Sequence, residues 1–230
     1  MNTITVDIDP NKWKTLYKIA GSAAIVMLIL IPIQIVVFSV SPIPSSVGEW
    51  YALFQSNWIL GLLHQDALYI INNIIVAVMY LAFYTSLKST DESLMTLALL
   101  LGFLGICAYF SSSQALEMLE LSRLYNTATL QSEKDMLLIA GQYVVAQWQG
   151  TAFTIYYILN GIALTLIALV MLKSSIYSKR TAVIGLASGL FMMIPSTFGT
   201  VGLIFSLLSL IPWYIFAILS AKKFFELARK

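Results

Sequence analysis

The sequence is dominated by one repeated feature, a run of about 20 mainly apolar residues bounded by charges or turn residues. A helix of this length crosses a hydrocarbon core of roughly 30 Å. Because lipid offers no hydrogen-bond partners, a helix that satisfies its own backbone is the structure such a run can adopt there. Six runs qualify, and they predict transmembrane helices at residues 17–40, 66–87, 93–113, 151–172, 181–198 and 201–221.

The composition favours a membrane protein over a soluble one. Of the 230 residues, 59% are hydrophobic and only 10% are charged, which is too apolar for an ordinary soluble domain. Six spans leave little chain for anything else, so we expect one transmembrane domain over residues 1–230, an all-α polytopic bundle. The first apolar run is longer than the roughly 7 to 15 residues of a signal peptide core, so it is expected to remain as the first span.

Two connections are long enough to carry structure of their own. Residues 41–65 begin with two prolines, and residues 49–63 then mix aromatic and polar side chains, which predicts an outer helix lying in the membrane interface. Residues 114–150, between spans three and four, predict a long outer connection of two helices with a turn near 126–132. Spans five and six are expected to meet in a tight turn at residues 195–199.

The distribution of positive charge predicts the orientation, because cytoplasmic loops retain Lys and Arg. With six spans, one side of the membrane holds only Arg123 and Lys134 of the 13 basic residues. We therefore expect both termini in the cytoplasm. A net charge of +2, segregated in this way, gives no reason to expect a nucleic acid partner. The basic residues on the cytoplasmic side are Lys12, Lys14, Lys18, Lys88, Lys173, Lys179, Arg180, Lys222, Lys223, Arg229 and Lys230.

Several chemistries are excluded by counting residues. The single histidine, His64, rules out a bis-histidine haem and a two-histidine zinc protease site. The single cysteine, Cys107, rules out an intramolecular disulfide and a cysteine-rich metal site. We therefore expect no cofactor, and we favour a binding protein over an enzyme.

Polar side chains follow one face of each of three successive helices when residues are placed at about 100° intervals. A polar group that faces lipid costs free energy, so these faces should turn toward one another. They predict a polar, tyrosine-lined cavity that opens to the outside. The faces carry Asp66, Tyr69, Asn73, Tyr80 and Tyr84; Tyr109, Ser113, Glu117 and Glu120; and Gln142, Gln149, Tyr156 and Asn160.

Such a cavity suits a small amphipathic or lipid-like ligand, because amides, phenols and carboxylates bind a polar head while the walls remain apolar. Simpler roles account for some of the same residues. Glu117 and Glu120 can be solvated partners of Arg123 on an outer helix. Asn73 and Asn160 can form hydrogen bonds between helices.

An enzymatic alternative uses the outer carboxylates. In it, Glu117 or Glu120 is the general base of a lipid-modifying enzyme, assisted by His64 and Asp66. The set His64, Glu117 and Glu120 is also a weak candidate for a metal site. The simpler interpretation is that His64 is an interfacial or capping residue and that Asp66 is the N-cap of span two.

The overall pattern resembles a widespread prokaryotic group of six-span integral membrane proteins of unknown function. The resemblance rests on the short basic N-terminus, the aromatic segment before span two, the long outer connection and a glycine-rich fifth span. It implies a prokaryotic plasma membrane and adds no catalytic residues. A third hypothesis is an accessory subunit whose polar faces contact a membrane protein partner.

Overall fold

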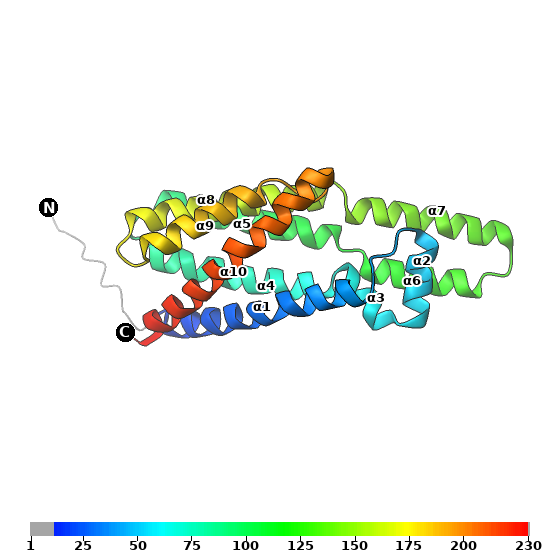
Figure 1. Cartoon of the computed structure of the whole chain (residues 1–230), viewed down its shortest axis with the longest axis horizontal. Helices are drawn as coiled ribbons and strands as arrows, with labels where there is room; N and C mark the ends of the chain where they lie inside the picture. The colour runs from blue at the N-terminus through cyan, green and yellow to red at the C-terminus, as the bar shows by residue number, and fades with distance from the viewer. Residues whose placement is uncertain (1–11, 230) are drawn as a thin grey trace.

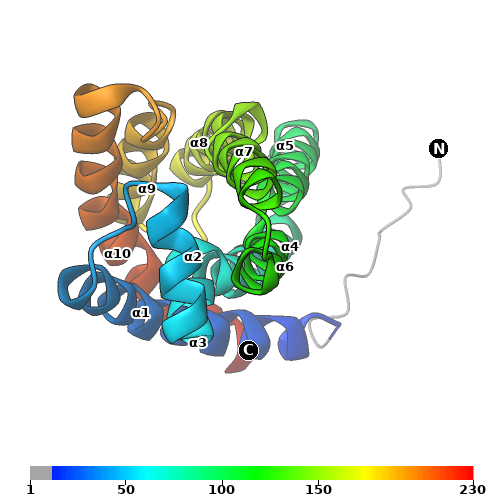
Figure 2. The ribbon, with the colours of Figure 1, turned by 90° about the vertical axis from the view of Figure 1, so that its right-hand side faces the viewer.

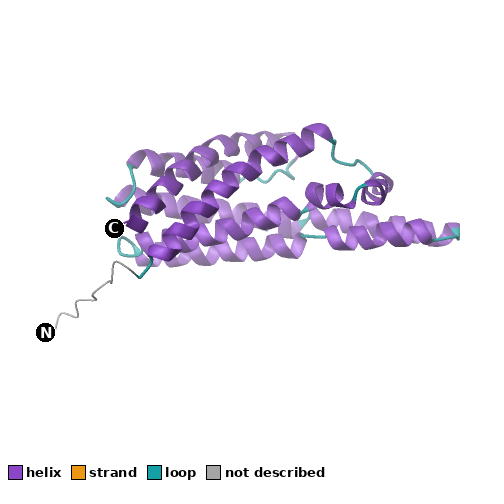
Figure 3. Ribbon diagram, turned by 90° about the horizontal axis from the view of Figure 1, so that it is seen from below, coloured by secondary structure: helices purple, strands orange, loops and turns teal. Residues whose placement is uncertain are grey.

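The computed structural model describes residues 12–229, and all regular structure in that range is helical. The predicted all-helical fold is therefore confirmed for this part of the chain, whereas Lys230 lies outside the described residues. Figure 1 shows most of the helices running along one long axis, with α2 lying across it, and Figure 3 shows that helices make up nearly all of the ribbon. The order is α1 (Lys14–Val40), α2 (Val47–Ser56), α3 (Trp58–Gln65), α4 (Ala67–Leu87), α5 (Glu92–Ser112), α6 (Ala115–Thr127), α7 (Gln131–Trp148), α8 (Thr151–Lys173), α9 (Lys179–Met192) and α10 (Gly199–Arg229).

Five stretches in the described residues are long and apolar enough to cross a membrane: α1, α4, α5 with α6, α7 with α8, and α10. The predicted span at residues 181–198 differs, because its helix α9 has 14 residues and ends at Met192. Pro195 lies three residues further on, and a proline disfavours helical backbone at the residue before it. A 14-residue helix rises about 21 Å, which is shorter than the hydrocarbon core.

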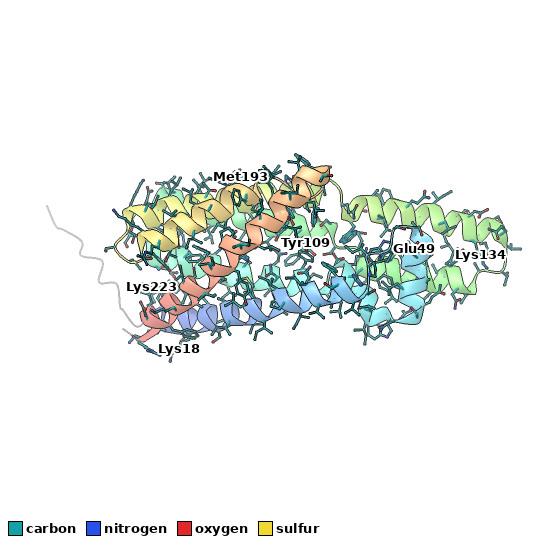
Figure 4. All side chains as sticks on the ribbon, viewed as in Figure 1. Lys18, Glu49, Tyr109, Lys134, Met193 and Lys223 are labelled. Carbon is teal, nitrogen blue, oxygen red and sulfur yellow. The ribbon has the colours of Figure 1, made fainter. Side chains whose placement is uncertain are left out.

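Six helices pack in a closed circuit. Each contacts the next in the order α5, α8, α9, α10, α1, α4 and back to α5. Figure 2 shows this circuit along the long axis. Both ends of the described chain lie at one end of the bundle, where Lys18 and Lys223 are labelled in Figure 4. We call this the proximal end, and the opposite end the distal end.

Aromatic packing fills the bundle at the proximal end. Phe83 on α4 lies at its centre, with its ring centroid 4.9 Å from that of Phe224 and 5.5 Å from that of Phe216 on α10. Tyr177, between α8 and α9, contacts Phe83 and shares a hydrogen bond of 2.9 Å with the hydroxyl of Ser86. These side chains are buried, so this end of the bundle is an apolar core.

Helices α1 and α10 are joined near a proline. Pro32 lacks the N–H that would bond to the carbonyl of Leu28 four residues earlier. The hydroxyl of Tyr214 on α10 donates to that carbonyl instead, at 3.1 Å. Beyond this contact the helices diverge toward the distal end (Figure 1), and the buried residues of α1 all fall between Tyr17 and Met27.

A second, smaller unit lies beyond the distal end of the circuit. It consists of α2, α6 and α7, and we call it the distal lobe. Trp50, Tyr51 and Phe54 on α2 are buried there with Met118 on α6 and Val144 on α7. Three aromatic side chains of the predicted outer helix, Trp50, Tyr51 and Phe54, therefore pack against protein, whereas Trp58 is 51% exposed. The predicted helix at residues 49–63 is also divided, because Asn57 ends α2 and its side chain caps α3.

Glycines let α8 and α9 approach closely. A Cβ atom added at Gly189 would lie 2.6 Å from the Thr165 hydroxyl and 3.0 Å from the carbonyl oxygen of Gly161. Small residues at such a crossing are common between membrane helices, since association in lipid depends on close packing. This contact holds the short helix α9 against the rest of the circuit.

Candidate functional site

Asp66 lies where three helix junctions meet at the distal end. Its carboxylate accepts hydrogen bonds from the backbone N–H groups of Gln114 and Ala115, at 2.7 and 3.0 Å. It also accepts from the indole N–H of Trp148 at 3.1 Å and from the hydroxyl of Tyr109 at 3.3 Å. The junctions between α3 and α4, α5 and α6, and α7 and α8 are thus held by one side chain.

The simpler interpretation of Asp66, as the N-cap of span two, is correct for its position but not for its hydrogen bonds. Asp66 occupies the N-cap position of α4 but makes no capping bond there, whereas it binds the first N–H groups of α6. A carboxylate at a helix N-terminus is stabilised by the free N–H groups and the helix dipole. Burial raises the pKa of the Asp66 carboxyl, and its four hydrogen bonds oppose that effect.

Beside Asp66 lie buried polar groups that have no hydrogen-bond partner among the described residues. Both ring nitrogens of His64 and both side-chain polar atoms of Gln65 are in this state. His64 is 1% exposed and Gln65 is 0% exposed. The His64 ring stacks on Phe38 of α1, with centroids 5.4 Å apart, and burial lowers the pKa of His64, so the imidazole is neutral at pH 7.

Buried polar atoms without a hydrogen-bond partner also occur deeper in the bundle, on α1 and α4. The side-chain nitrogen of Gln34 on α1 and the side-chain oxygen of Asn73 on α4 are buried without a partner. Asn73 is 0% exposed, and its nitrogen donates to the backbone of its own helix at Tyr69. The Gln34 side chain lies near the hydroxyl of Tyr69 and the Asn73 side chain near that of Tyr156, but Gln34 Nε2 and Asn73 Oδ1 do not reach hydrogen-bond geometry with them. An unpaired buried amide lowers the free energy of unfolding by about 1–3 kcal/mol. A cluster of several such groups therefore needs a physical explanation.

Tyrosines connect these groups across the bundle. The rings of Tyr69 and Tyr109 are 5.9 Å apart, and those of Tyr109 and Tyr156 are 5.1 Å apart. Deeper in the bundle, the hydroxyl of Tyr80 donates to the side-chain oxygen of Asn160 at 2.8 Å. Figure 4 shows Tyr109 in the middle of the molecule, between the circuit's two ends. We name as the distal polar network Gln34, His64, Gln65, Asp66, Tyr69, Asn73, Tyr109, Trp148 and Tyr156.

The structure brings together most of the residues predicted for the site. Asp66, Tyr69, Asn73, Tyr109 and Tyr156 belong to the network, while the Tyr80–Asn160 pair lies below it.

Three other predicted residues lie elsewhere, because the helices break. Glu117 and Glu120 are exposed on α6, where Glu120 lies 3.7 Å from Arg123, and Gln149 is exposed after α7. Ser113 has extended backbone (ψ 124°) and ends α5. The side chains of α6 therefore point in directions that are not set by the helical repeat of α5, and the predicted polar face does not continue into α6. Ser113 itself is half-buried at this break, with its hydroxyl unpaired.

The weak metal candidate is wrong. Within residues 12–229, no three His, Cys, Asp or Glu side chains gather closely enough to hold a metal ion, so His64, Glu117 and Glu120 do not form such a site. The two acids are exposed, whereas His64 and Asp66 are buried. The arrangement offers no shared catalytic step for these four residues.

Sequence reasoning missed three members of the network. Gln34 is the one amide side chain in the predicted first span. A search for polar faces that included this span would have identified it. Gln65 adjoins Asp66 in the chain but lies in the preceding helix. Trp148 is followed by Gly150, a helix-breaking signal, yet its partner is 82 residues away and no local pattern reveals that pairing.

Two open grooves lie on the distal lobe, away from the network. One of about 530 Å³ is formed by the α6–α7 turn and includes Leu124, Glu133 and Met136. The other, of about 270 Å³, includes Trp58, Arg123 and Asn126.

Comparison with known proteins identifies no relative of this chain. No family model, no curated protein and no solved structure matches it.

Proposed function

We propose that this protein is a six-span integral membrane protein that binds a small amphipathic or lipid-like molecule in the distal polar network, for sensing or transport. The observation that carries the proposal is the group of buried polar atoms without partners on Gln34, His64, Gln65 and Asn73. Native proteins satisfy such atoms with protein, water or ligand. A polar head group that reaches the network would supply the missing hydrogen bonds.

The surrounding surface supports access from the membrane. The distal halves of α1 and α10 expose apolar side chains, among them Ile35 and Val36 on α1 and Leu207 and Ile211 on α10. The two helices diverge beyond the Tyr214–Leu28 contact (Figure 1). An apolar tail that lies against these exposed side chains would remain in a lipid-like environment while its head enters the network.

The orientation belongs to the same proposal. Both termini are cytoplasmic, α9 is the fifth span, and the distal lobe is outside the cell. The excess of Lys and Arg at the proximal end supports this arrangement. The short α9 would cross with the help of the turn at 193–198, or the bilayer would thin locally, as it does around short spans.

The experiment compares two neighbouring asparagines on α4. Asn73 is a fully buried member of the network, whereas Asn72 is half-buried and lies about 100° away around the helix. Native mass spectrometry of protein released from nanodiscs made with host lipid should detect a bound small amphiphile on the wild type. The adduct should be lost from Asn73→Leu and kept by Asn72→Leu.

Two outcomes contradict the proposal. A wild-type protein that carries no adduct above that of the empty nanodisc control has no such ligand. Equal adducts on both variants place the ligand outside the network.

A further inference from the structure

The distal polar network contains no Lys or Arg side chain. The segments that form it, residues 34–73, 109–115 and 148–156, include no Lys or Arg. Arg123, the nearest in the chain, is on α6 with its side chain 65% exposed and paired with Glu120. A carboxylate or phosphate in the network would be a buried anion without a counter-charge, and burial of such an ion is costly.

The network also has no free negative charge. Asp66 is its acid, and that carboxylate already accepts four hydrogen bonds, two of them from the N-terminal turn of α6. A helix N-terminus carries a partial positive charge that offsets a carboxylate placed on it. A buried ammonium head would therefore find no carboxylate lone pair oriented toward it.

The groups that remain free are uncharged and offer both donors and acceptors. The amides of Gln34 and Gln65 present unpaired N–H groups, the amides of Gln65 and Asn73 present unpaired oxygens, and neutral His64 presents one donor and one acceptor. Hydroxyl and carbonyl groups on a ligand match this set, because each forms hydrogen bonds without carrying charge.

From these three observations we infer that the ligand of the distal polar network is an uncharged lipid-like molecule whose head carries hydroxyl or carbonyl groups. The inference rests on the proposed function and narrows its ligand to one class. Aromatic side chains on several sides of the network, including Phe38 and Tyr69, provide the apolar contact that such a weakly polar head needs.

The test uses three amphiphiles that share a twelve-carbon tail: dodecanol, dodecanoate and dodecylamine. Thermal unfolding is measured in nanodiscs of zwitterionic lipid, at a pH where the acid is ionised and the amine is protonated. Dodecanol should raise the Tm of the wild type and of Asn72→Leu, and should leave that of Asn73→Leu unchanged. If Asn73→Leu does not fold, Gln34→Leu replaces it, with the exposed Gln147→Leu as its control.

The outcomes separate the inference from the proposed function. A larger shift with dodecanoate or dodecylamine that disappears in Asn73→Leu overturns the uncharged head and leaves binding at the network intact. No shift with any amphiphile overturns both. A dodecanol shift that persists in Asn73→Leu, or in Gln34→Leu where that variant replaces it, places the ligand elsewhere and overturns the inference as well.

Discussion

A single carboxylate links parts of the chain that are far apart in sequence. Asp66 holds the start of α6, the end of α7 and the end of α5 through donors from Ala115, Trp148 and Tyr109. An amide in its place would turn an N–H toward some of these donors and leave them buried without an acceptor. At the scale of the residue, Asp66 is therefore expected to contribute more to stability than any exposed acid of the chain.

We predict that Asp66→Asn lowers the free energy of unfolding by about 3 kcal/mol, since several buried donors lose a charged acceptor. Thermal unfolding in detergent, followed by circular dichroism, measures the change. Asp91→Asn is the matched control, because Asp91 caps α5 through Leu94 and pairs with Lys173 at a solvent-exposed site. Its loss should be smaller, and equal losses would refute a special role for Asp66.

The neutral imidazole of His64 predicts a dependence on pH. Burial holds the pKa of His64 below its ordinary value of 6.5, so the folded state binds fewer protons than the unfolded state as the pH falls through that value. Stability should therefore decrease as the pH is lowered from about 7 to 5. Since His64 is the only histidine, a His64→Phe variant should show a flatter profile over this range, and an unchanged slope would disprove the assignment.

The helices themselves were largely predictable, because long apolar runs leave a chain in lipid little choice but helix. Their breaks were harder to predict. The predicted polar face through Tyr109 includes Glu117 and Glu120 only if the helix is continuous, but the extended backbone at Ser113 ends α5 before them. The convergence of Tyr69, Tyr109 and Tyr156 was predictable, since it depends only on continuous stretches of helix.

Close packing of α8 and α9 gives a prediction at the scale of the element. Gly189→Leu should lower the free energy of unfolding by about 2 kcal/mol, because the new side chain meets backbone atoms of α8. Gly48→Ala is the control, since a Cβ there has no neighbour within 4 Å. It should be neutral or stabilise α2 by about 0.5 kcal/mol. Thermal unfolding of the two variants under the same conditions tests whether their effects differ in sign.

For the whole molecule, the number of spans remains the main prediction. Five stretches meet the length and hydropathy of a span, and α9 falls short of that length. The two ends of the described chain, residues 12–229, lie at the same end of the bundle, which an even number of crossings requires. The likeness to a six-span prokaryotic family also stays a prediction, since no family model matches the chain.

Cysteine labelling tests the topology. In a Cys107→Ser background, single cysteines replace Thr129 on the distal lobe, Ser175 between α8 and α9, and Thr197 between α9 and α10. A maleimide that cannot cross the membrane should label the Thr129 and Thr197 variants in intact cells and the Ser175 variant only after permeabilisation. If the Ser175 and Thr197 variants are labelled under the same condition, α9 does not cross.

The distal lobe has a practical consequence. Helix α7 has 18 residues and rises about 27 Å (Figure 3). In the proposed orientation, the hairpin that it forms with α6 would stand clear of a micelle around the circuit. Small membrane proteins enclosed in detergent give electron microscopy little asymmetry with which to align particle images. An antibody fragment raised against residues 128–135 would bind the end of the distal lobe, away from the distal polar network. The resulting map would show what occupies that network.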